Sequence, residues 1–82
     1  MHQHQLRALH RNNLRSAIRF YREWLKNNHE SYRDAFWRFI GHAEVYADLS
    51  FAADANKGRR LYDRISTVKN IVTAHDMKRS AA

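Results

Sequence analysis

The sequence predicts an all-α protein, a small three-helix bundle with an up-down-up arrangement. The chain has 82 residues with no Pro and only two Gly, a composition that argues against an all-β protein with many tight turns. Apolar residues recur every three or four positions in three stretches that short polar segments separate, as in bundle helices. The length supports one domain spanning 1–82, with tails at 1–4 and 79–82 that we expect to fray.

The first stretch predicts a helix from about Gln5 to Lys26. Within it, the Asn12-Asn13 pair leaves two interpretations open: a continuous helix, or a shorter one that Asn13 caps. We expect a turn over 27–30, where Asn tolerates the left-handed conformation at the end of a helix. The apolar side of this helix consists of Leu6, Leu9, Leu14, Ala17, Ile18, Tyr21, Trp24 and Leu25.

The second stretch predicts a helix with Ser31 as its N-cap and Asp34 in a shortened capping box. Asp48 or Ser50 could cap a new helix, but we favour a second helix that continues to about Asn56 and stops at Gly58, a residue suited to the left-handed position after a helix. The densest core is expected where its aromatic start meets the end of the first helix. Its apolar face consists of Tyr32, Ala35, Phe36, Phe39, Ile40, Ala43, Tyr46 and Ala47.

The third stretch predicts a helix that ends near Met77, before the basic residues Lys78 and Arg79. An alternative to the monomeric bundle is a homodimer in which two helical hairpins complete each other's core. The apolar line of the third helix consists of Leu61, Ile65, Val68, Val72 and His75, with Ile71 beside it.

Charge is distributed unevenly along the chain. The formal net charge is +7, from 15 Lys and Arg against 8 Asp and Glu, yet residues 30–56 are acidic and both flanking segments are basic. The first helix carries cations at spacings of three and four, which places them in an arc about 120° wide opposite the apolar side. We call this set the arginine stripe: Arg7, Arg11, Arg15, Arg19, Arg22 and Lys26.

The arginine stripe has two interpretations. Arg is favoured where planar, bidentate contact with phosphate or carboxylate matters, so the stripe is a candidate binding face. Alternatively, its cations pair within the molecule with Glu30, Asp34 or Glu44 of the acidic second helix. A second cationic group on the third helix consists of Arg59, Arg60 and Arg64, with Lys57 beside them.

The sequence contains no catalytic or metal-binding pattern. The absence of Cys excludes disulfides and Cys-based zinc sites. None of the six His forms the i, i+4 pair of a helical zinc site, and two isolated Gly cannot build a phosphate-binding loop. We therefore expect no enzyme activity, no metal and no cofactor. We also expect no membrane span and no secretory signal, hence a cytoplasmic protein.

These features predict a small basic accessory or regulatory protein that acts by binding. The primary hypothesis is binding to the backbone of duplex DNA or structured RNA through the arginine stripe and the second cationic group. The alternative is an inhibitor or adaptor that docks on an acidic protein surface. Trp37 and Leu49 lie off the apolar face of the second helix and are the candidates for a protein contact or a homodimer contact. Membrane-surface binding ranks last.

Overall fold

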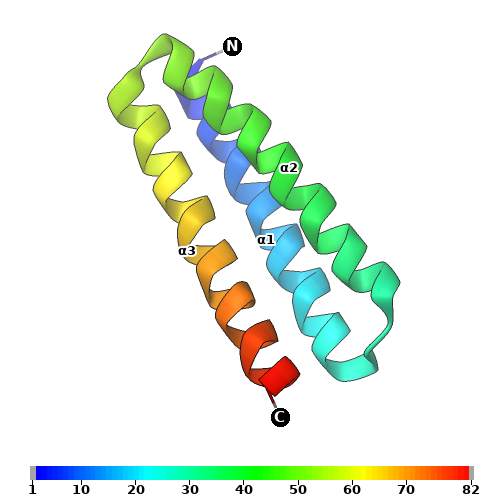
Figure 1. Ribbon diagram of the computed structural model, residues 1–82. Helices are drawn as coiled ribbons and strands as arrows, with labels where there is room; N and C mark the ends of the chain where they lie inside the picture. The colour runs from blue at the N-terminus through cyan, green and yellow to red at the C-terminus, as the bar shows by residue number, and fades with distance from the viewer. Residues whose placement is uncertain (1, 82) are drawn as a thin grey trace.

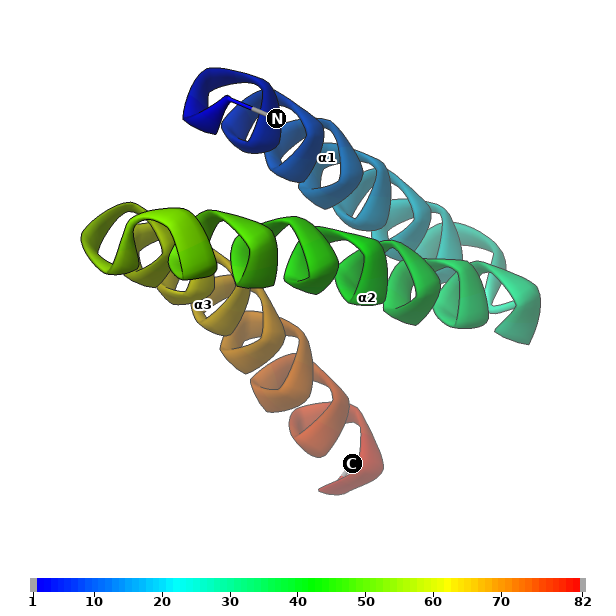
Figure 2. The same cartoon turned by 90° about the horizontal axis from the view of Figure 1, so that it is seen from above.

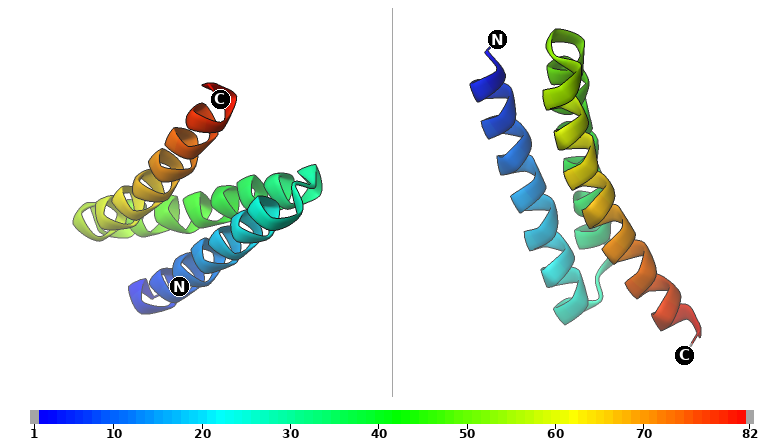
Figure 3. Two further views of the ribbon diagram at one scale, coloured as in Figure 1. Left: turned by 90° about the horizontal axis from the view of Figure 1, so that it is seen from below. Right: turned by 90° about the vertical axis from the view of Figure 1, so that its left-hand side faces the viewer.

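The computed structural model describes residues 2–81, and over that range the fold is entirely helical (Figure 1). The elements are α1 (Gln3–Asn27), α2 (Glu30–Ala53) and α3 (Ala55–Ala81). Consecutive helices run in opposite directions, so α1 and α3 run in the same direction, with their axes inclined to one another (Figures 2 and 3). The Cα atoms span 43 × 20 × 12 Å. Helix α1 begins and α3 ends inside the tails that we expected to fray, whose extreme residues Met1 and Ala82 lie outside the described part of the chain.

Helix α1 is one continuous helix, which decides between the two interpretations of the Asn pair. Asn13 does not cap a new helix; its side-chain amide donates to the carbonyl of Leu9, one turn earlier, at 2.8 Å. The helix ends at Asn27, and the next residue, Asn28, adopts the predicted left-handed conformation with φ 53° and ψ 31°. The N–H of Asn28 donates to the carbonyl of Trp24 at 2.7 Å, so one of the last carbonyls of α1 is satisfied.

The start of α2 differs from the prediction. The N-cap is His29 rather than Ser31, because the Nδ1 atom of His29 accepts the backbone N–H of Ser31 at 3.2 Å. The imidazole of His29 therefore caps the helix in place of the predicted Ser31 hydroxyl. Glu30 becomes the first helical residue, where its negative charge suits the positive end of the helix dipole.

The junction between α2 and α3 also corrects the prediction. Helix α2 ends at Ala53, and Asp54 has an extended backbone. The side-chain Oδ1 of Asp54 accepts the backbone N–H groups of Asn56 and Lys57 at 3.1 and 3.2 Å. Asp54 thereby caps the start of α3. Gly58 lies inside α3 without a positive φ, so the predicted left-handed helix end is wrong. A Cβ at Gly58 would lie 2.3 Å from the Cα of Phe51, so glycine is required here for the close approach of α2 and α3.

Helix α2 forms the centre of the fold. It contacts both neighbours, whereas the contact between α1 and α3 is the smallest of the three (Figures 2 and 3). Ala43 and Ala47 are fully buried, and their small side chains permit close packing against α2. The main core cluster consists of Ala17, Tyr21, Trp24, Phe36, Ile40, Ala43, Ala47, Leu61, Ile65 and Val72.

The aromatic contact between α1 and α2 is confirmed. The ring of Phe20 stacks on Phe39 and Tyr32, with centroid distances of 5.5 and 6.4 Å. Tyr21 packs against the fully buried Phe36 at 5.6 Å. These pairs lie beside the short α1–α2 turn, where the sequence placed the densest core, and they fix the two helices side by side.

The apolar line of α3 is confirmed in part. Leu61, Ile65 and Val72 are buried, and His75 is half-buried. Ile71, which we placed beside this line, is 64% exposed. Because α3 packs mainly on α2, its other flank meets little of α1 and stays open to solvent. The helix also continues past Met77 to Ala81.

The two glycines predict opposite responses to alanine. Gly58→Ala should lower the free energy of unfolding by about 1–3 kcal/mol, because the new Cβ would meet the backbone of Phe51. Gly41→Ala is the matched control: no atom lies within 4 Å of its added Cβ, and it should stabilise the helix by about 0.5–1 kcal/mol. Urea unfolding followed by circular dichroism measures both. Equal effects of the same sign would contradict the packing described at Gly58.

Two adjacent aromatic residues should differ sharply in their contribution to stability. Phe36→Ala removes a side chain with no exposed surface and should cost about 3–5 kcal/mol. Trp37→Ala should cost only about 1 kcal/mol, because Trp37 is 39% exposed and makes one edge contact with Phe36 at 4.9 Å. Thermal or urea unfolding of both variants tests this assignment, and a larger loss for Trp37→Ala would refute it.

Candidate functional site

Every member of the arginine stripe is exposed on α1. In the described part of the chain, Lys26 is the only stripe member in an ion pair, with Glu23 of the same helix at 3.9 Å. Side chains spaced by three and four residues along a helix extend as one row on its outer surface. The stripe therefore presents guanidinium groups to solvent along most of the length of α1.

The acidic residues considered as partners for the stripe do not neutralise it. Glu44 pairs instead with Lys69 of α3, at 2.8 Å. Within residues 2–81, no ion pair joins Glu30 or Asp34 to the stripe. The intramolecular interpretation of the stripe thus finds no support in the described contacts.

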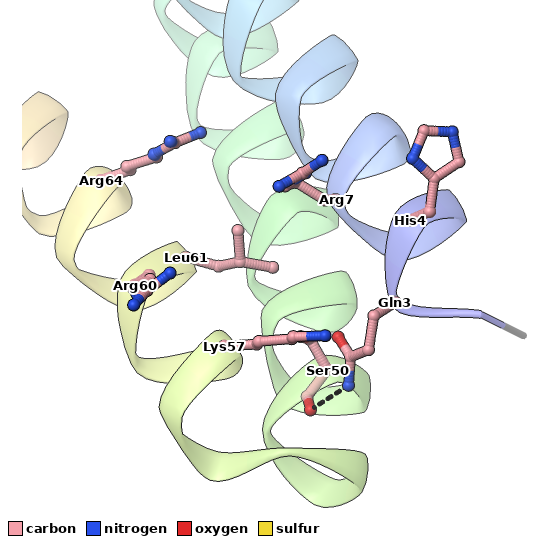
Figure 4. Close-up of a pocket in the computed structure, with 8 residues that line it drawn as sticks. All are labelled: Gln3, His4, Arg7, Ser50, Lys57, Arg60, Leu61 and Arg64. Carbon is pink, nitrogen blue, oxygen red and sulfur yellow. Dashed lines mark hydrogen bonds between the residues drawn. The ribbon is translucent and has the colours of Figure 1, made fainter.

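A cleft joins the arginine stripe to the second cationic group. It lies between the start of α1, the end of α2 and the start of α3, with a volume of about 220 Å³ (Figure 4). Arg60 and Arg64 line this cleft together with Arg7, whereas Arg59 is exposed outside its lining. The lining residues are Gln3, His4, Arg7, Ser50, Lys57, Arg60, Leu61 and Arg64, and none of them is acidic.

Hydrogen bonds fix the wall of the cleft. The amide nitrogen of Gln3 donates to the carbonyl of Ser50 at 3.0 Å, and the Ser50 hydroxyl donates to the amide oxygen of Gln3. Ser50 is 1% exposed, and this reciprocal, part-buried pair ties the start of α1 to the end of α2. Asp54 and Gly58 set the start of α3 opposite, as described above. The cations of the cleft are therefore held on a defined frame.

His10 is a buried residue next to the cleft that the sequence reasoning missed. It is fully buried, and its Nε2 donates to the carbonyl of Leu61 at 3.2 Å, because a carbonyl can only accept. Its Nδ1 is buried without a partner among the described residues. Burial lowers the pKa of His10 below the ordinary 6.5, and the positive charge of Arg64 lowers it further, against the opposing effect of the Leu61 bond. Its spacing of four residues from Leu6 was the available indication of a core position.

The predicted protein-contact residues are both exposed on α2, at different positions around the helix. Trp37 is 39% exposed and Leu49 is 48% exposed. Trp37 also lines a second pocket, of about 450 Å³, at the opposite end of the molecule from the cleft. In that region the guanidinium of Arg79 lies 4.5 Å from the centre of the Trp24 ring, a cation–π contact that covers the core. Arg33, on the same pocket, pairs with Asp76 at 2.7 Å.

Two kinds of site are not seen in the described chain. No three His, Asp or Glu residues among positions 2–81 come together as potential metal ligands. Within the same range, none of the helices has the length and apolar character needed to cross a membrane.

Comparison with protein-family models, curated proteins and solved structures finds no match to this chain.

The burial of neutral His10 predicts acid sensitivity. Below pH 6.5 the unfolded chain takes up a proton at His10 that the folded chain resists, so this contribution to stability is present above pH 6.5 and lost as the pH falls towards the lowered pKa. The free energy of unfolding should therefore fall more between pH 7.5 and pH 5 in the parent than in a His10→Gln variant. Urea unfolding at both pH values measures this difference, and identical slopes would contradict it.

Proposed function

We propose that this protein binds the sugar-phosphate backbone of duplex DNA or structured RNA through the arginine stripe. The observation that carries the proposal is the row of exposed arginines on α1 that lack carboxylate partners in the described chain. Like charges at these spacings weaken an isolated helix, so the stripe works against helix stability. Guanidinium groups match the bidentate geometry of phosphate oxygens, and binding phosphates would offset the repulsion.

The dimensions of the stripe suit a nucleic-acid backbone. Arg7 and Lys26 are separated by about 28 Å along the helix axis, at 1.5 Å per residue. That distance corresponds to about eight base pairs of duplex, at 3.4 Å per base pair. Contacts to phosphate carry little sequence information, so we infer binding with weak sequence preference, as suits an accessory or regulatory protein.

The two sides of the molecule differ in charge, which would orient it on a polyanion. Apart from Arg33 and Arg38, every Lys and Arg lies in α1 or α3. Helix α2 carries the acidic residues Glu30, Asp34, Glu44 and Asp48. A polyanion would attract the α1 side and repel α2. The binding unit in this proposal is the up-down-up three-helix bundle, acting in the cytoplasm.

The proposal is tested by a salt series with a mixed-sequence DNA duplex and a structured RNA. If all six stripe cations contact phosphates, the slope of log K against log salt should approach about −5 on the duplex, at 0.9 per contact. Fluorescence anisotropy measures the affinity, and light scattering of the same sample gives the stoichiometry. Absence of binding to either ligand at low salt would overturn the proposal.

A pair of single variants separates the stripe from net charge. Arg15→Glu and Arg38→Glu change the net charge by the same amount at exposed positions, but only Arg15 lies on the stripe. Arg15→Glu should weaken duplex binding about tenfold and make the salt slope shallower by about one. Arg38→Glu should change the affinity much less. Equal losses would show that net charge, not the stripe, determines binding.

A second candidate function is docking on an acidic protein surface as an inhibitor or adaptor. It is favoured by the apolar residues exposed on α2, where Trp37, Val45 and Leu49 are 39%, 53% and 48% exposed. Exposed aromatics commonly anchor protein interfaces, and the same residues would form the contact of a homodimer. The comparison of Arg15→Glu with Arg38→Glu separates the candidates, because a basic protein-binding module that attracts DNA only through its net charge would lose affinity equally in both variants.

A further inference from the structure

We propose that the cleft between the starts of α1 and α3 is a binding site for a phosphate monoester dianion. This inference deepens the proposed function and rests on it in one respect: the ligand we favour is the terminal phosphate of a nucleic acid. Inorganic phosphate offers the same chemistry without the nucleic acid. The cleft would then recognise an end, while the arginine stripe contacts the side of the strand.

The charge of the cleft is the first argument. Four cations line one cavity of about 220 Å³: Arg7 from α1, and Lys57, Arg60 and Arg64 from α3. None of these four is in an ion pair in the described chain, and no acidic residue lines the cavity. Bringing several positive charges together on a fixed frame costs free energy. A ligand with two negative charges would offset more of that cost than the single charge of a backbone diester.

The donor chemistry of the cleft is the second argument. Three arginines supply planar forks that bind two oxygens of one phosphate, and Lys57 adds a compact point charge. Figure 4 shows Arg7 extending from α1, and Arg64 and Lys57 from α3, into the space between the two helices. A terminal phosphate has three oxygens free of the chain, and a backbone phosphate has two, so donors that approach from two sides favour the terminal group.

The size of the cleft is the third argument. The cleft has a volume of about 220 Å³, far more than the roughly 10–15 Å³ that a single water requires. It is smaller than the roughly 300–1,000 Å³ of sites that enclose a whole small molecule. We infer that the phosphoryl group enters the cleft while the sugar and base stay outside.

Gln3 belongs to the wall of this site. Both polar atoms of its side-chain amide are engaged by Ser50, so it holds the wall of the cleft rather than the ligand. Arg7 follows about one turn later on the same helix. The ligand-binding groups in this assignment are therefore the three arginines and Lys57.

The test compares short duplexes that carry either a 5′-phosphate or a 5′-hydroxyl, in phosphate-free buffer at constant ionic strength. The parent should bind the phosphorylated duplex about tenfold more tightly, the scale expected for one charge-assisted contact set. Arg60→Gln/Arg64→Gln should abolish this preference. The matched control, Arg15→Gln/Arg19→Gln, removes equal charge from the outer side of α1 and should weaken both duplexes while keeping the ratio. Circular dichroism confirms that each variant is folded.

Titration with inorganic phosphate, followed by NMR, distinguishes failure of the site from failure of the proposed function. Shifts of amide signals around Arg60 and Arg64 that the cleft variant loses would support the site even if neither duplex binds, in which case the proposed function fails alone. Equal affinity for the two duplexes without any phosphate-induced shifts would overturn the site and leave backbone binding standing. Retention of the end preference in the cleft variant would also overturn it.

Discussion

The packing of both α1 and α3 against α2 is the constraint on which the fold depends. Phe36, Ile40, Ala43 and Ala47 present one buried face of α2 to the core, and α1 and α3 pack against that helix far more than against each other. Two helices that pack on a common third helix need not meet along their length. At the end where Gln3 ties α1 to α2, the space between α1 and α3 remains open as the cationic cleft. The candidate site is thus a consequence of how the core is assembled.

The distribution of ion pairs follows the same arrangement. The pairs that cross between helices, Lys69–Glu44 and Arg33–Asp76, both join α2 to α3. Exposed pairs of this kind contribute little to stability, typically about 0–1 kcal/mol. Helix α1 is held instead by its buried aromatic and apolar side chains, so the fold does not require its outer cations to be neutralised. This separation of stability from surface charge leaves the arginine stripe available to an external polyanion.

The sequence predicted the three helices because apolar periodicity reports which side of each helix is buried. It failed where the outcome depended on a neighbouring segment. Gly58 was predicted to follow the end of a helix. Glycine is required there because Phe51 of α2 lies so close, and the residues around Gly58 in the sequence do not indicate this contact. Ser31 was the predicted N-cap of α2, but His29 takes that position because its Nδ1 accepts the backbone N–H of Ser31. His10 was not predicted as a core residue, because the apolar pattern counts only apolar side chains, although His10 lies on the buried side of α1.

The arginine stripe could be predicted from the sequence and the cleft could not, again because the cleft depends on neighbouring segments. The arginine stripe lies on one helix, so spacing alone defines its geometry. The cleft joins Arg7 to Arg60 across a gap of more than fifty positions in sequence, and only the packing of both helices on α2 brings them together. A stripe on an outwardly curved surface can contact successive phosphates but cannot surround one, whereas a concave group of donors can. The two surfaces are adjoining at Arg7, so a strand lying along α1 would bring its terminus to the cleft without a change in the fold.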